Sequence, residues 1–322
     1  MLTEMSTAVV SLEATATAQA TKIARLETSV ATAASESADF CRGITINGDD
    51  EFERLAPHLR SCTAMAGPLI LQYVSNASAI AEAFQNLRVV TGDGTNSRGS
   101  HGGHSDECQG LCGRGAIRIR DCGITTFDGA FPVLASAGSI DFFNNAALVT
   151  LERAFPSLVA VTDGPIQIYN NVALINLEQA FPSLVAVTGT TSVSILISGN
   201  QEDPTPPTID GAFPALRTVS GYISIQEFPY LETFGTAFPL LETVPDLRIN
   251  DNNRLISVGA SFGRLRNVVN SPGLGMLSFR QNGMRFCQNA RAILCPLTGV
   301  YSPYGDANDC CTAYCGANRV NC

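Results

Sequence analysis

The 322-residue chain has no tryptophan and few charged side chains, because only 15% of its residues are Asp, Glu, Lys or Arg. Few charges together with 28 glycines favour short strands and tight turns over long exposed helices. Basic residues are also scarce, 20 against 29 acidic ones, which gives a net charge of −9. Since binding to a phosphate backbone depends on clustered Lys and Arg, the composition argues against a nucleic-acid partner.

Long hydrophobic runs are missing as well. No stretch reaches the roughly 18 to 20 apolar residues that a membrane-spanning helix needs, so we expect no membrane span in this chain. The first thirty residues contain no unbroken apolar segment of the kind found in secretory signals.

Cysteine is absent from the middle of the chain and concentrated toward its ends. The eleven cysteines form three groups, one with Cys41 and Cys62, one with Cys108, Cys112 and Cys122, and a third of six between residues 287 and 322. Such clusters are typical of disulfides formed in an oxidising compartment, so we expect an extracellular or cell-surface location. Because eleven is odd, at least one thiol is expected to stay free or to bond another chain.

A repeat of about 25 residues runs through the centre of the chain. Each copy contains Ala-Phe-Pro or a degenerate form of it, followed by Leu-x-x-Val, a glycine and a segment of the form Ile-x-Ile-x-x-Asn. The repeated phenylalanines are Phe84, Phe131, Phe155, Phe181, Phe213, Phe238 and Phe262. The alternation in Ile-x-Ile is typical of a strand with one buried face, which a single turn cannot cover. Stacked turns would cover it, so the repeat predicts a solenoid with a parallel sheet.

The other repeated residues are expected to be architectural. The Leu and Phe of each copy are predicted to form two further columns of the core. The asparagines after each strand are predicted to satisfy backbone groups at the bend, and they are Asn145, Asn171, Asn200 and Asn253.

The beginning of the repeat region resembles a known module. The segment Leu59-Arg-Ser-Cys62-Thr-Ala-Met-Ala-Gly67, preceded by Cys41-Arg-Gly and followed by Ala83-Phe-x-x-Leu-x-x-Val-x-Gly92, is similar to the opening of the receptor L-domain. This relative of the leucine-rich repeat occurs in insulin-receptor-like and EGF-receptor-like ectodomains and in some fungal wall proteins. The resemblance covers about residues 40–298 and implies a right-handed β-helix, a Cys41–Cys62 disulfide, and extracellular binding or wall structure without catalysis.

The predicted organisation is therefore a mainly β chain in three parts. Residues 1–39 form a heptad helix, a possible coiled coil, and a linker. Residues 40–285 form a receptor L-domain-like solenoid of about eight turns, with an inserted loop at 93–115. Residues 286–322 form a disulfide-rich cap over the last turn.

The N-terminal heptads lie in residues 2–30, where apolar residues alternate at spacings of three and four with Gln19 as the one polar member. One interpretation is a coiled coil that makes a homo-oligomer. The alternatives are a single amphipathic helix lying on the solenoid and a disordered leader rich in Thr, Ala and Ser.

The inserted loop carries His101, His104, Cys108 and Cys112, which could complete a tetrahedral zinc site. Because the spacing is not a common zinc frame, a disulfide-pinned loop is the default interpretation, and no cofactor is expected. Asn76-Ala-Ser78 is a glycosylation sequon that is used only in a secreted protein.

No catalytic motif is present, and the residues expected on the outer sheet face argue against an enzyme. These residues are Arg118, Arg120, Asp141, Phe143, Gln167, Tyr169, Ser194, Ser224, Gln226, Arg248, Asn250, Ser278 and Arg280. Only Asp141 is a carboxylate, so the paired acids of a polysaccharide-cleaving enzyme are missing.

The same outer face suggests a ligand-binding function. Phe143 and Tyr169 occupy equivalent positions in adjacent turns, and Arg118, Arg120 and Arg248 are expected to flank them. Aromatic residues and Arg are the types that dominate interfaces, although two isolated exposed aromatics are also ordinary on a sheet. The sequence predicts a non-catalytic module that recognises an extracellular protein or glycan through this face. The alternative is a structural subunit of an extracellular coat, wall or filament assembled by the N-terminal helix.

Overall fold

The computed structural model describes residues 40–92, 115–189, 191–199, 205–270, 273–280, 282 and 300–301. The predicted helix in residues 2–30 and the four candidate zinc ligands lie outside the described residues. Of the predicted cap, only Val300 and Tyr301 are described.

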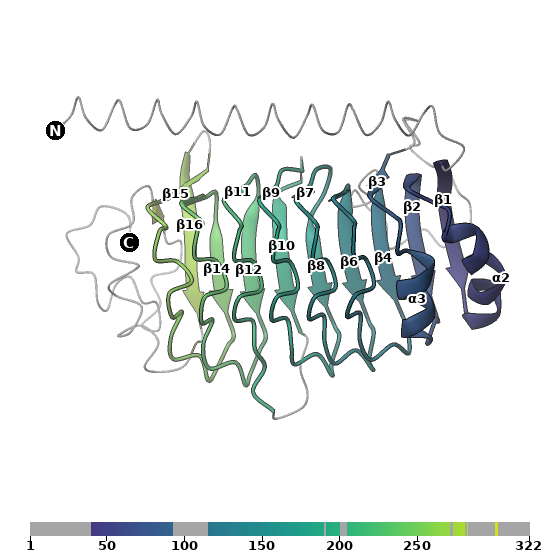
Figure 1. The fold of residues 1–322 in the computed structure, drawn as a ribbon. Helices are drawn as coiled ribbons and strands as arrows, with labels where there is room; N and C mark the ends of the chain where they lie inside the picture. The colour runs from purple at the N-terminus through teal and green to yellow at the C-terminus, as the bar shows by residue number, and fades with distance from the viewer. Residues whose placement is uncertain are drawn as a thin grey trace, which may run out of the picture. The chain divides into compact units, whose positions relative to one another are not determined.

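The described chain is a mainly β solenoid of about eight turns, which confirms the predicted fold class. Each turn adds one strand to a long main sheet (Figure 1). In spatial order its strands are β1 (Phe40–Asn47), β2 (Ala64–Gln72), β4 (Ala116–Arg120), β6 (Ser139–Phe143), β8 (Ile166–Tyr169), β10 (Val193–Ser198), β12 (Tyr222–Gln226), β14 (Leu247–Asn250) and β16 (Gly273–Arg280). Pairing is parallel from β2 through β16. The predicted inward residues stack in register, as in Ile117, Ile140 and Ile166.

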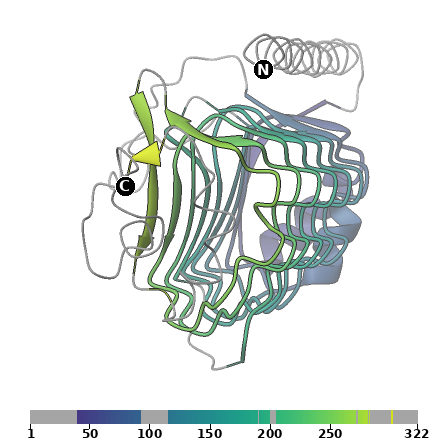
Figure 2. The ribbon, with the colours of Figure 1, turned by 90° about the vertical axis from the view of Figure 1, so that its left-hand side faces the viewer.

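A second series of short strands follows the main sheet turn by turn. These strands are β3 (Val89–Thr91), β5 (Ser136–Ala137), β7 (Ala160–Val161), β9 (Ala186–Val187), β11 (Thr218–Val219), β13 (Thr243–Val244) and β15 (Asn267–Asn270). Strand β15 pairs antiparallel with β16, and β17 (Val300–Tyr301) pairs parallel with β16. Viewed along the solenoid, successive turns overlie one another, with the main-sheet strands on one side (Figure 2).

Two helices occur in the described residues, both in the first turns of the solenoid (Figure 1). Helix α2 (Asp49–Leu59) begins after Gly48, whose φ of 82° suits glycine, and its first turn is acidic, which complements the positive end of the helix dipole. Helix α3 (Ala77–Ala83) begins at Asn76, whose side chain caps it. Neither of these helices of the described residues is long and apolar enough to cross a membrane.

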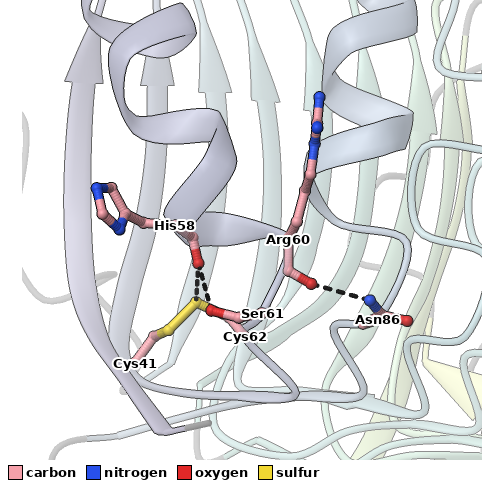
Figure 3. Close-up of a disulfide and its surroundings, with 6 residues drawn as sticks. All are labelled: Cys41, His58, Arg60, Ser61, Cys62 and Asn86. Atoms are coloured by element: carbon pink, nitrogen blue, oxygen red, sulfur yellow. Dashed lines mark hydrogen bonds between the residues drawn. A yellow bond between two sulfur atoms is a disulfide. The ribbon is translucent and has the colours of Figure 1, made fainter.

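The Cys41–Cys62 disulfide that the resemblance implied is present (Figure 3). It joins β1 to the segment after α2, with 5.6 Å between the two Cα atoms. Beside it, Ser61 Oγ donates to the carbonyl of His58, and Asn86 Nδ2 donates to the carbonyl of Arg60 from the next turn. The disulfide therefore closes the first turn where hydrogen bonds tie that turn to the second.

The repeated phenylalanines form the predicted column of the core. Neighbouring rings are 5.0–5.5 Å apart from Phe84 to Phe262, and beyond the first pair the ring planes lie within 10° of parallel. Every ring is at most 1% exposed. The two degenerate copies of the motif, at Phe84 and Phe262, therefore continue the same column.

A second column consists of buried asparagines just after the strands. Asn145 Nδ2 and the Asn145 backbone N–H both donate to Asn171 Oδ1, each over 3.0 Å, and Asn171 Nδ2 donates to the carbonyls of Phe142 and Tyr169. The prediction is confirmed for these two residues. It is wrong for Asn253, which is exposed, because the buried member in that turn is Asn252. Asn200 lies outside the described residues.

Cys122 occupies the same column position one turn before Asn145. Its N–H donates to Asn145 Oδ1 over 3.0 Å, and its thiol donates to the carbonyls of Leu71 and Arg120, as an asparagine amide does in the other turns. The thiol is free and buried, so the expectation that it takes part in disulfide stapling is wrong. Asn and Cys can both occupy this position because each side chain donates a hydrogen bond to a backbone carbonyl at the bend. Removing Cys41, Cys62 and Cys122 from eleven cysteines leaves eight, so the odd number no longer requires a bond to another chain.

Cys122 is therefore expected to resist alkylation in the folded protein. Burial raises the pKa of its thiol from 9.0 to about 11, which reduces the reactive thiolate about 100-fold, and the sulfur is also shielded from reagent. Iodoacetamide at pH 8, followed by peptide mass mapping, should modify Cys122 in denaturant and leave it unmodified in the native protein. Rapid native modification, or recovery of Cys122 in a disulfide, would contradict its place in the column.

Candidate ligand-binding face

The outer face of the main sheet carries two columns of side chains, aligned by strand register. The first column is Ile70, Arg118, Asp141, Gln167, Leu196, Ser224, Arg248 and Ser278. The second is Gln72, Arg120, Phe143, Tyr169, Ser198, Gln226, Asn250 and Arg280. Alternation along each strand points the residues between these columns into the core.

Four of the five predicted binding residues come together on three neighbouring strands. Arg120, Phe143 and Tyr169 are consecutive members of one column, and Arg118 lies beside Arg120. The Phe143 and Tyr169 rings stack at 4.7 Å between centroids, with 27° between their planes, and both side chains are partly exposed. We call Arg118, Arg120, Phe143 and Tyr169 the first cluster.

The guanidinium of Arg120 is held by the preceding turn. With the Gln72 amide oriented so that its nitrogen donates to Asn47 Oδ1 over 2.6 Å, its oxygen accepts from Arg120. Gln72 is 7% exposed. This contact restricts the long Arg120 side chain, and Arg120 is the register neighbour of Phe143 on the adjacent strand.

Arg248 does not lie beside the aromatic pair. It is on β14, three strands from the β8 strand of Tyr169, or about 14 Å at the usual strand spacing. Its guanidinium carbon lies 4.0 Å from the centroid of the Tyr222 ring, and Nη2 is 3.6 Å from Asp246 Oδ2. Arg280 follows on the adjacent strand. We call Tyr222, Arg248 and Arg280 the second cluster.

Five residues of this face were not identified from the sequence, and they are Ile70, Gln72, Leu196, Ser198 and Tyr222. Leu196 lies on the outer face where Ser194 had been expected, because Leu196 pairs with Gln167 and Ser224, whereas Ser194 Oγ accepts from the N–H of Gly221 over 2.7 Å. The Ile195-x-Ile197 alternation would have identified Leu196. Tyr222 was missed because it precedes the alternating segment of its strand.

A lane of polar residues separates the two clusters. It consists of Gln167, Ser198, Ser224 and Gln226, with Leu196 as its one apolar neighbour in the two columns. Ser224 Oγ donates to Gln226 Oε1 over 3.2 Å, and Ser198 Oγ donates to Glu227 Oε2 over 3.0 Å. We call these four residues the polar lane.

Asp141 lies within the first column between Arg118 and Gln167. Burial raises the pKa of its carboxyl from 3.8 to about 6, while the positive charges of Arg118 and Arg120 act in the opposite direction. Its Oδ1 atom is buried and accepts no hydrogen bond. The charged carboxylate is therefore poorly stabilised at neutral pH.

Replacing Asp141 with Asn is expected to stabilise the protein at pH 7.5 but not at pH 4. The unfolded carboxyl ionises near pH 4 and the folded one only near pH 6, so the wild type loses stability as the pH rises through this window. The full difference corresponds to at most ~3 kcal/mol, and partial exposure reduces the expected gain to about 1–2 kcal/mol. Urea unfolding at both pH values measures it. An equal gain at pH 4 would show that the carboxylate charge is not the cause.

The predicted glycosylation residue is accessible. Asn76 is exposed, and its Oδ1 accepts from the N–H of Ala79 over 3.1 Å and from Ser78 Oγ over 2.9 Å. A glycan would attach to Nδ2, which these contacts do not use, so the helix cap is compatible with glycosylation. In the described part of the chain, no group of three or more His, Cys, Asp or Glu side chains is placed to hold a metal ion.

No protein-family model matches this chain, no curated protein matches it, and no solved structure matches it. The residues of the sheet face are therefore the evidence on the function of this chain.

Proposed function

We propose that the protein is an extracellular, non-catalytic recognition module of the receptor L-domain type that binds a protein or glycan through the outer face of its main sheet. The observation that carries this proposal is the in-register run of Arg120, Phe143 and Tyr169. Aromatic and Arg side chains contribute most of the binding energy in interfaces. Here they are ordered before any ligand arrives, by ring stacking and by the contact with Gln72, which reduces the entropy lost on binding.

The Cys41–Cys62 disulfide supports an extracellular location, because disulfides persist in oxidising compartments. The alternative of a structural subunit depended partly on an unpaired cysteine that could bond another chain. Since Cys122 is free and buried, the odd cysteine count by itself no longer supports a bond to another chain. Recognition is therefore the better supported of the two functions.

The test is a binding screen of the full chain against arrays of glycans and of purified extracellular protein domains. The double variant Phe143→Ser/Tyr169→Ser removes the stacked rings from a surface position. The matched control is Val149→Ser/Val159→Ser, because these side chains are 38% and 37% exposed and lie outside the two columns. Both variants should melt cooperatively.

The proposal predicts array ligands whose affinity falls at least tenfold in the ring variant and stays unchanged in the control. Ligands bound equally by both variants, or no ligand on either array, would overturn it.

A further inference from the structure

We propose that the ligand is an extended acidic glycan that lies along the solenoid axis and binds both clusters of the sheet face. This inference rests on the proposed function and names its ligand class. Three features of the face support it: its charge, the separation of its clusters and the chemistry of the polar lane.

The charge of the face is opposite to that of the whole chain. The chain carries a net charge of −9, yet the two columns contain four arginines and a single carboxylate, Asp141. The arginines are Arg118, Arg120, Arg248 and Arg280. Guanidinium groups bind carboxylates and sulfates through paired, charge-assisted hydrogen bonds. A basic face on an acidic protein also attracts anionic partners selectively while other surfaces repel them.

The separation of the clusters favours a polymer over a small anion. Six strand steps separate β4, which carries Arg118 and Arg120, from β16, which carries Arg280. At the usual strand spacing this is about 29 Å. One carboxylate or one sugar ring can contact only one cluster. A chain of several sugar units that runs along the axis can contact both, and the second contact then benefits from a high effective concentration.

The polar lane favours a glycan over a protein partner. Protein interfaces have an apolar core, but between the clusters Leu196 is the one aliphatic residue of the columns, and the partly exposed polar group there is the amide of Gln226, because Gln167, Ser198 and Ser224 are at most 8% exposed. The exposed large hydrophobic residues of the described chain lie outside both columns, and they are Tyr73, Val149, Val159 and Ile256. The Gln226 amide can hydrogen-bond sugar hydroxyls, and the partly exposed rings of Phe143, Tyr169 and Tyr222 can pack against the C–H faces of sugar rings.

The test compares immobilised polygalacturonate with its methyl-esterified form, which has the same backbone without the charge, and adds heparin as a sulfated probe. The full chain should bind at least one of the two anionic polymers. Binding to methyl-esterified polygalacturonate should be at least tenfold weaker than binding to the free acid when the acid is the ligand, and added salt should weaken anionic binding.

The variants Arg118→Gln/Arg120→Gln and Arg248→Gln/Arg280→Gln should each reduce polymer affinity at least tenfold. The charge-matched control is Arg54→Gln/Arg217→Gln, because both residues are exposed and lie outside the two columns; its affinity should stay within twofold of the wild type. A short uronate oligomer should depend on one cluster at most.

No binding to either anionic polymer, binding that is unaffected by esterification, or equal losses in the face and control variants would overturn the inference. If the arrays then show a neutral glycan or protein ligand that depends on Phe143 and Tyr169, the proposed function stands and only the ligand class is wrong. If no ligand depends on these rings, both proposals fail.

Discussion

Replacing Phe181 with Ala should lower the free energy of unfolding by about 3–5 kcal/mol, the usual cost of truncating a buried aromatic ring. Phe181 is fully buried near the middle of the phenylalanine column, 5.2 Å from the Phe155 ring and 5.0 Å from the Phe213 ring. Alanine would leave a cavity between two turns. The parallel sheet on either side restricts the collapse of these turns, so neighbouring side chains can fill little of the space. Urea and thermal unfolding followed by circular dichroism measure the loss.

The control for this prediction is Phe181→Leu, which keeps most of the buried volume and should cost about 1–2 kcal/mol. If Phe181→Ala cost less than about 1 kcal/mol, the column would be filling space without holding successive turns together.

The fold was predictable because its core is periodic. The same strand and Phe positions recur in successive turns, so a wrong prediction at a single position does not change the predicted architecture. The Phe84 and Phe262 copies lack the following proline, yet their rings join the column, because stacking depends on the ring and not on the proline.

The sheet face was less predictable because position on a face depends on strand register. Ser194 and Leu196 lie near a register irregularity in β10, between Val193 and Ile195. The alternation of its strand was enough to predict that Arg248 lies on the outer face. Its distance from Tyr169 was not predictable in the same way, because it depends on the number of turns between the two residues and on the column that each residue joins. Cysteine grouping in the sequence likewise misassigned Cys122, whose position after β4 is that of the asparagines in later turns.

A solenoid by itself does not define a function, since the same architecture presents many different surfaces. In this chain the proposed function depends on a few outer-face positions, whereas the buried columns stabilise the fold. Variants of the two sets should therefore have different effects. Changes at Phe143 or Arg248 should alter ligand affinity with little effect on folding, whereas changes in the buried phenylalanine and asparagine columns should lower the free energy of unfolding.

Replacing Asn252 with Ala is expected to cost about 2–3 kcal/mol, the penalty for leaving buried backbone groups without partners. Asn252 is fully buried; its Oδ1 accepts from the N–H of Phe228, and its Nδ2 donates to the carbonyl of Ile225, both over 3.1 Å. Alanine would strand both backbone groups between two turns, where water cannot replace the amide.

The neighbouring residue provides the matched control, because Asn253→Ala changes the same side chain at an exposed position and should alter stability by less than about 0.5 kcal/mol. Urea unfolding of the two variants side by side separates the amide column from any general effect of losing an asparagine in this loop. Equal losses would mean that the column contributes no more than a surface amide does. A loss confined to Asn252→Ala would show that this bend depends on its own buried amide. In the turn that contains Cys122, we expect the thiol to have the role of that amide, because it donates to backbone carbonyls in the same way.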